Sequence, residues 1–144
     1  MTELIAKYKI LKEHNLIIEY YFGDLELDSL INHKQKLTLD SEFSPGFNCF
    51  INLKNVTFKT TPEDITNFVS FIKEKSSVFG KRRIALIKNS PNQVVSTSLY
   101  KILQQGMDQS VEIFSTYEKA LKWLNIDIDS NDIIKILQKL KTSS

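Results

Sequence analysis

Hydrophobic and polar positions at the start of the chain predict a β-hairpin followed by a helix. Apolar residues alternate with lysines over residues 7–13, as in an edge strand whose lysines discourage pairing with other chains. Residues 16–22 are apolar except for Glu19, which predicts a strand covered on both faces. Apolar residues at helical spacing follow, so we expect a helix over residues 27–38.

The rest of the chain continues as strands that alternate with helices. Alternation over residues 47–53 and short apolar runs at 84–87 and 111–114 predict three more strands. Apolar residues at helical spacing predict one helix that begins at Thr61, a second that begins at Ser90 and ends at Gly106, and a third over 117–124. The order β-β-α-β-α-β-α-β-α indicates an α/β fold: a mixed, mostly parallel sheet of about five strands, with helices packed on it and right-handed crossovers.

This pattern assigns residues 1–124 to one α/β domain and residues 125–144 to a C-terminal extension. An amphipathic helix is expected near 130–141, and its apolar stripe comprises Ile133, Ile134, Leu137 and Leu140. We expect the stripe to pack across the sheet of the same domain. Contact with a partner chain, such as a second copy, is the alternative.

Composition narrows the class of protein. The 144 residues are 42% hydrophobic and 25% charged, with a net charge of +2, as in an average soluble domain. These values exclude a disordered tail and argue against a dedicated nucleic-acid binder. No apolar run approaches the roughly 20 residues that span a bilayer. With no signal peptide and one cysteine, we expect a cytoplasmic protein.

No set of catalytic, cofactor-binding or metal-binding residues emerges from the sequence. His14 and His33 lack the spacing of metal ligands and are expected at the surface or in turns. Cys49 lies in a predicted strand without a flanking base, so we expect it to act as a small apolar residue. The basic cluster at residues 81–83 precedes an apolar strand and is expected to be solvated. The sequence therefore predicts a protein that is not an enzyme.

One segment, residues 50–62, resembles the central part of STAS domains, the anti-sigma-factor antagonists. In that family an apolar strand ends in Asp-Leu, and a polar turn leads to Asp-Ser-Ser-Gly at the start of a helix. Asn52-Leu53 stands where Asp-Leu would be, and Val56 and Phe58 fit the turn. The element order over residues 7–124 suits the same fold. The chain is closest in pattern to the divergent SpoIIAA-like branch, which is grouped as STAS/SEC14-like.

The resemblance implies a phospho-acceptor position and an interaction loop. Thr61 occupies the position of the serine that is phosphorylated in switch-type STAS domains. The motif around it is degenerate, because Thr60, Pro62 and Glu63 replace the aspartate, second serine and glycine. Thr61 followed by proline and acids is also a good helix N-cap. The interaction loop implied by the resemblance comprises Asn55, Thr57, Lys59, Thr60 and Thr61.

Two functions from different classes follow. The STAS resemblance implies a non-enzymatic module that regulates or binds a protein partner or a second copy. The SEC14-like resemblance implies, as the alternative, a carrier or sensor of a small hydrophobic ligand. Seven phenylalanines between residues 43 and 79 are consistent with the alternative, but an ordinary core is the favoured interpretation.

Overall fold

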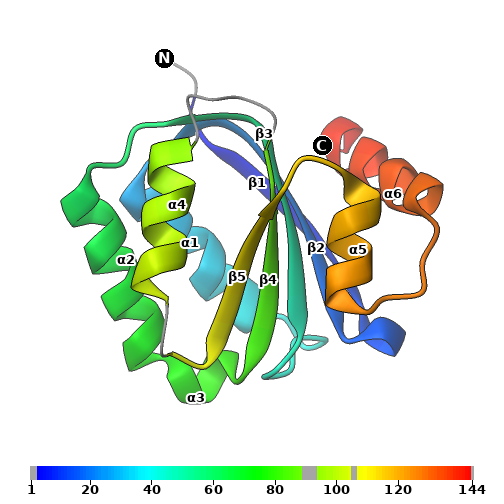
Figure 1. The fold of residues 1–144 in the computed structure, drawn as a ribbon, viewed down its shortest axis with the longest axis horizontal. Helices are drawn as coiled ribbons and strands as arrows, with labels where there is room; N and C mark the ends of the chain where they lie inside the picture. Colours follow the sequence, from blue (N-terminus) through cyan, green and yellow to red (C-terminus); the bar gives the residue numbers. More distant parts are fainter. Residues whose placement is uncertain (1–2, 89–93, 105–106, 144) are drawn as a thin grey trace.

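The computed structural model describes residues 3–88, 94–104 and 107–143, and this part of the chain forms a five-stranded sheet with helices on both faces (Figure 1). The strands lie side by side in the order of the sequence. The first strand, β1 (Ile5–Leu11), is antiparallel to β2 (Leu16–Leu25). The other strands run parallel to β2: β3 (Asn48–Phe58), β4 (Arg82–Ile87) and β5 (Gln109–Phe114). The predicted α/β fold with a mixed, mostly parallel sheet is confirmed.

The helices divide between the two faces according to the path of the chain. One face carries α1 (Leu27–Thr38), α2 (Pro62–Glu74) and α4 (Val94–Leu103). Each parallel connection advances by one strand in the same direction, and right-handed crossovers therefore place these three helices together. Figure 1 shows α5 (Tyr117–Leu124) and α6 (Ser130–Thr142) on the opposite side. We call the two sides the α1 face and the α6 face. Ser90 and Gly106, the predicted limits of the helix before β5, lie outside the described residues.

Two short helical segments complete the fold. The 3-10 turn η1 (Lys12–His14) connects β1 to β2, and Asn15 after it adopts a left-handed conformation. The helix α3 (Ser76–Phe79) leads from α2 toward β4 and buries the ring of Phe79 beside Phe68 and Ile72.

Each face of the sheet has its own hydrophobic core, because successive strand residues point to opposite sides. Ile17, Tyr21 and Ile51 contribute to the core on the α1 face. Leu16 and Phe50 belong to the core on the α6 face. Residues 16–21 of β2 are therefore buried on both sides, as the sequence predicts, whereas Phe22 at the end of the run is exposed.

The apolar side of α6 lies against the sheet of its own chain. Ile133 is fully buried, and Leu137 is buried beside it in the core of the α6 face. Ile136 and Leu140 are partly buried at the edge of this core. Ile134, which the sequence pattern placed on the stripe, is partly exposed and outside the cluster. The helix contacts β1 and β2, whereas α5 contacts β4 and β5.

The STAS-like segment contains a β-bulge where the resemblance led us to expect a turn. Tyr20 of β2 pairs with Asn52 of β3, but Phe22 pairs with Asn55. Between these two pairs β2 advances by two residues, whereas β3 advances by three. The extra residue in β3 defines a bulge. The strand continues to Phe58, because it still pairs with β2 and still buries Val56 on the α1 face. The expectation that Asn55 and Thr57 lie in a loop is therefore wrong.

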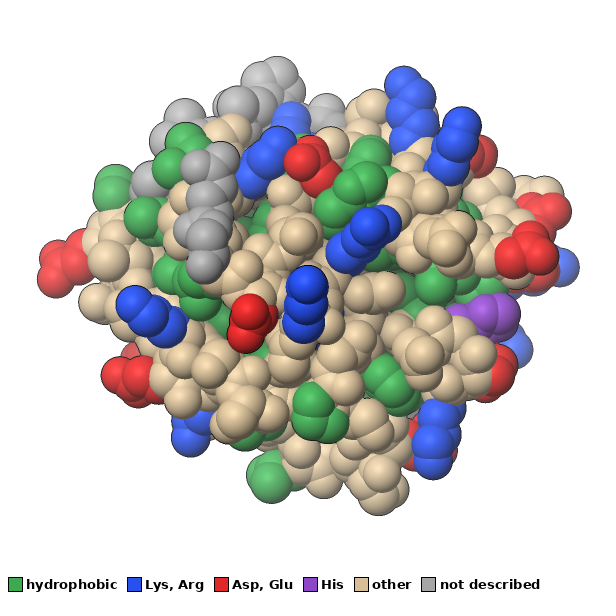
Figure 2. Space-filling view, turned by 60° about the horizontal axis from the view of Figure 1, so that its bottom comes forward, with side chains coloured by type: hydrophobic (Ala, Val, Ile, Leu, Met, Phe, Trp, Pro, Cys, Tyr) green, Lys and Arg blue, Asp and Glu red, His purple; other side chains and the backbone are tan. Residues whose placement is uncertain are grey.

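The surface carries charges of both signs. On the face shown in Figure 2, lysine and arginine side chains are interspersed with acidic ones. This distribution fits the net charge of +2. No helix in the described ranges is long and apolar enough to cross a membrane.

Candidate functional site

A cavity of about 70 Å³ lies on the α1 face, at the carboxyl ends of β2, β3 and β4. Its apolar walls come from α1, α2 and the strands beneath them, and they include Leu27, Leu30, Leu53, Ile65, Phe68 and Leu86. Small-molecule sites are mostly apolar pockets that contain a few polar groups, and this cavity has that character. The cavity is therefore a candidate ligand site.

A polar group inside the cavity has no hydrogen-bond partner among the described residues. Thr60, between β3 and α2, lines the cavity, and its Oγ1 atom is buried without a hydrogen bond to any described residue. Buried polar atoms in native proteins almost always have a hydrogen-bond partner. A molecule in the cavity that presents a hydrogen-bonding group would satisfy this hydroxyl.

An acidic hollow adjoins the cavity at the edge of the sheet. It has a volume of about 370 Å³ and is lined by Asp24, Glu26, Leu27, Asp28, Lys59 and Asp64. Leu27 and Asp64 line both spaces, so the hollow and the cavity are neighbours. Among the described residues, no group of three or more potential ligands is arranged to hold a metal ion.

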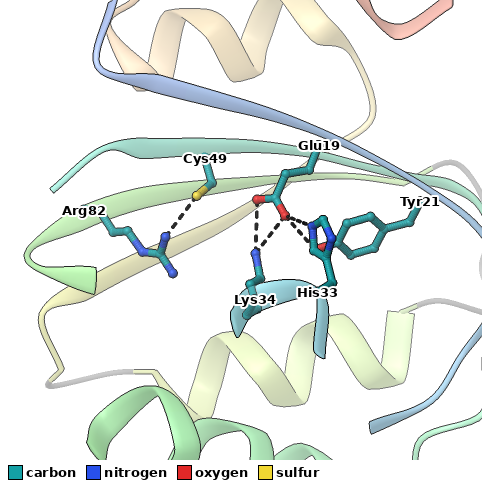
Figure 3. Close-up of polar contacts among 6 residues, drawn as sticks. All are labelled: Glu19, Tyr21, His33, Lys34, Cys49 and Arg82. Carbon is teal, nitrogen blue, oxygen red and sulfur yellow. Dashed lines mark hydrogen bonds and ion pairs between the residues drawn. The ribbon is translucent and has the colours of Figure 1, made fainter. Parts of the chain in front are cut away.

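Beneath one wall of the cavity lies a buried polar network centred on Glu19 of β2 (Figure 3). Lys34 Nζ lies 2.9 and 3.1 Å from the two carboxylate oxygens of Glu19. The same carboxylate is 2.9 Å from His33 Nε2 and accepts a 2.8 Å hydrogen bond from the Tyr21 hydroxyl. Glu19 has no exposed surface. Lys34 and His33 belong to α1, so this network ties α1 to the sheet.

The network holds Glu19 in its charged form. Burial alone would raise the pKa of Glu19, but the Lys34 ammonium and the hydrogen bond with His33 outweigh it. The pKa of Glu19 therefore lies well below its usual value. Burial, together with the neighbouring Glu19 carboxylate, raises the pKa of Tyr21 well above its usual range, so Tyr21 remains a hydrogen-bond donor.

A second buried cation, Arg82, lies beside this network at the start of β4. Its Nη1 atom donates to Cys49 Sγ at 3.2 Å, and its guanidinium lies 4.5 Å from the centre of the Phe79 ring. With the Gln109 amide oxygen turned toward it, that oxygen accepts from Arg82 Nε at 3.2 Å. Burial raises the pKa of the Cys49 thiol, which opposes thiolate formation.

Sequence reasoning missed three members of this region. His33 and Arg82 were expected in solvent, but only 6% and 3% of their surfaces are exposed. In the sequence, Glu19 stands out only as a charged residue within the apolar run of residues 16–22. That interruption was the available signal, because a carboxylate in a strand covered on both faces must be paired. Its partners come from α1 and could not be assigned without knowing where α1 packs.

The five residues of the predicted interaction loop lie at different places. Asn55 and Thr57 belong to β3, and Asn55 Nδ2 donates to the Tyr20 hydroxyl at 3.2 Å on the α6 face. Lys59 lines the acidic hollow, and Thr60 lines the cavity. Of the five residues, therefore, only Thr60 lines the cavity and only Lys59 lines the hollow beside it.

Thr61 is the N-cap of α2, as its sequence predicts. Its Oγ1 atom accepts a 3.1 Å hydrogen bond from the backbone N–H of Asp64, and Asp64 Oδ2 accepts one of 2.9 Å from the backbone N–H of Thr61. These reciprocal bonds form a capping box, which satisfies two backbone donors at the helix start. The hydroxyl of Thr61 is thus engaged in holding α2.

Comparison with known proteins identifies the fold. No family model matches the chain, and no curated protein matches it. Among solved structures, it is similar to an uncharacterized protein of the DUF3478 family from Shewanella loihica PV-4, which has a SpoIIAA-like fold. The TM-score is 0.55 at 13% sequence identity, and the match covers 86% of this chain and 98% of the other. The chain has a SpoIIAA-like α/β fold.

Proposed function

We propose that this protein is a non-enzymatic binding module whose ligand is a small apolar molecule held between α1, α2 and α4. The observation that carries the proposal is the apolar cavity at the carboxyl edge of the sheet. Ligand pockets are mostly apolar, with a few polar groups that orient the ligand, and Thr60 supplies one such group here.

The size of the cavity indicates the size of the ligand. Its volume of about 70 Å³ is roughly half that of an engineered cavity of about 150 Å³ that binds benzene. A short aliphatic group fills such a space, and a longer molecule would extend into the adjoining hollow. A four-carbon alcohol is therefore a suitable probe.

We expect 1-butanol to bind with a saturable, millimolar dissociation constant, because a ligand of so few atoms buries little surface. Methyl NMR spectra should show shifts at Leu27, Leu53, Ile65 and Leu86, which line the cavity. The methyl groups of Ile133 on the α6 face serve as the internal control. Equal, non-saturating shifts on both faces would show a solvent effect and contradict the proposal.

A variant that fills the cavity provides a second control. Thr60→Leu places a larger apolar side chain in the space that Thr60 lines. Saturable binding of 1-butanol should then disappear while the methyl spectrum of the α6 face remains unchanged. Unaltered binding in this variant would place the alcohol elsewhere on the protein.

An exposed apolar pair favours protein interaction as a second candidate function. Ile5 and Phe22 are 46% and 41% exposed and pair across β1 and β2, so both lie on the same face of the sheet. Asn55 is the neighbour of Phe22 in β3. In this candidate function, a protein partner or second copy contacts these residues. Thr61 would take the phospho-acceptor role, and a phosphoryl group there would break the capping box and add charge beside Asp64.

For this candidate, Phe22→Gln should weaken self-association or capture of a partner by about tenfold or more, as expected for an interface aromatic residue. Sedimentation velocity measures the self-association, and pull-down measures capture of another protein. Leu39→Gln is the matched control, because Leu39 has the largest exposed fraction of any large apolar residue in the described ranges and lies at the end of α1. Equal effects of the two substitutions would count against a specific surface at Phe22.

A further inference from the structure

We infer that the ligand of the cavity carries a protonated amine, with its apolar end in the cavity and its ammonium group in the acidic hollow. This inference rests on the proposed function and specifies the class of ligand. It is based on which charges in the walls of the cavity and of the neighbouring hollow are paired with an opposite charge and which are not.

Charge in the inner wall of the cavity is already compensated. Lys34 is the cation of that wall, and its ammonium is bonded to both carboxylate oxygens of Glu19. A ligand carboxylate placed at this end would have to compete with Glu19 for Lys34 and would lose its own hydration. The inner end of the cavity therefore favours an uncharged, apolar group.

Charge in the outer hollow is uncompensated and negative. Four carboxylates and one ammonium, Lys59, line it. Among the described residues, Asp24, Glu26 and Asp28 form no ion pair. The starts of α1 and α2 lie here as well, and each contributes about half a positive charge, so the carboxylates remain in excess.

The apolar cavity and the acidic hollow lie next to each other. Leu27 and Asp64 line both the cavity and the hollow, so one short molecule can contact both. A protonated amine donates up to three hydrogen bonds, and the carboxylates of the hollow and the Thr60 hydroxyl of the cavity can accept them. A small amine with a short aliphatic chain matches the acceptors, the charge and the size of the site.

Three four-carbon probes that differ only in their head group test the inference: butylamine, 1-butanol and butyrate. At neutral pH and low salt, butylammonium should bind about fivefold or more tightly than 1-butanol, and butyrate should bind least tightly. The advantage of butylammonium should shrink as sodium chloride is added, because the hollow is open to solvent. Saturation of the cavity methyl shifts measures all three constants.

Neutralising the hollow should remove the preference for the amine. In the triple variant Asp24→Asn, Glu26→Gln, Asp28→Asn, the ratio of the butylammonium and 1-butanol constants should fall close to one. A control variant with the same change in net charge, Glu118→Gln, Asp127→Asn, Asp132→Asn, alters exposed acids outside the hollow. This control should keep the ratio of the unmodified protein.

The measured constants distinguish failure of the proposed function from failure of the inferred cationic head group. If none of the three probes gives saturable shifts at the cavity, the proposed function itself fails. If 1-butanol binds but butylammonium binds no more tightly, or butyrate binds most tightly, the proposed function stands and the inference of a cationic head group is overturned. An equal loss of preference in both triple variants would assign the effect to net charge and also overturn the inference.

Discussion

Glu19→Gln should lower the free energy of unfolding by about 3–5 kcal/mol, the usual cost of removing one partner from a buried ion pair. The substitution keeps the shape of the side chain but leaves the Lys34 ammonium buried without a counter-charge, since 3% of Lys34 is exposed. It also weakens the acceptor for the Tyr21 hydroxyl and for His33. Urea unfolding monitored by circular dichroism measures the change.

The exposed ion pair between Lys101 and Glu112 provides the control. Its N–O distance is 2.9 Å, the same as that of Lys34 and Glu19, but about 40% of each side chain is exposed. Glu112→Gln should therefore change stability by less than about 1 kcal/mol. The double variant Glu19→Leu, Lys34→Met should recover most of the loss, because it removes both charges together. A small effect of Glu19→Gln alone would contradict the buried network.

The same carboxylate makes stability depend on pH. The pKa of Glu19 is lower in the folded protein than its unfolded value of about 4.3, because the folded state stabilises the charged form. Its contribution is therefore fully present above that unfolded value and is lost as the pH falls toward the lower folded value. The unmodified protein should lose stability below about pH 5 more steeply than Glu19→Gln.

The sequence was sufficient to predict the sheet and its helices. Residues 16–21, for example, are buried because helices cover both faces of the sheet (Figure 1), although Phe22 at the end of this run is exposed. The N-cap at Thr61 was also predictable, because the capping box depends on residues only three positions apart. Such local patterns do not require knowledge of distant contacts.

The candidate site was not predictable in the same way. The cavity is enclosed by three helices that meet only after the chain has made three crossovers. The two partners of Glu19 in α1 lie 14 and 15 residues away along the chain, and Cys49 lies 33 residues from Arg82. The bulge at residues 52–55 of β3 has no local signature in the sequence. The alternation pattern therefore predicts a strand that ends too early, at residue 53, and it places Asn55 in a loop.

The buried polar network and the cavity share residues of α1 and β2. Lys34 and Tyr21 belong to the network and also line the cavity. The network therefore positions one side of the cavity, and a substitution at Glu19 should disturb ligand binding as well as stability. The charged residues that anchor α1 place it so that Leu27 and Leu30 complete the apolar wall.

The second large effect is expected at the other face, where Ile133→Ala should lower the free energy of unfolding by about 2–5 kcal/mol. Ile133 has no exposed surface and packs in the core that α6 and α5 form with the sheet. The right-handed crossovers place α1, α2 and α4 on one side, so α5 and α6 provide the cover for the opposite side. Truncating Ile133 leaves a cavity over β1 and β2 that neighbouring side chains fill only in part.

Ile134→Ala is the matched control for this prediction, because the adjacent isoleucine is partly exposed and outside the core. It should change stability by less than about 1 kcal/mol in the same urea titration. A large difference between the two variants would make residues 125–144 an integral part of the folding unit, since a domain of typical stability, about 5–15 kcal/mol, cannot lose such an amount from a dispensable extension. Equally small effects would instead show that residues 1–124 are stable without α6, which would then be free to bind a partner.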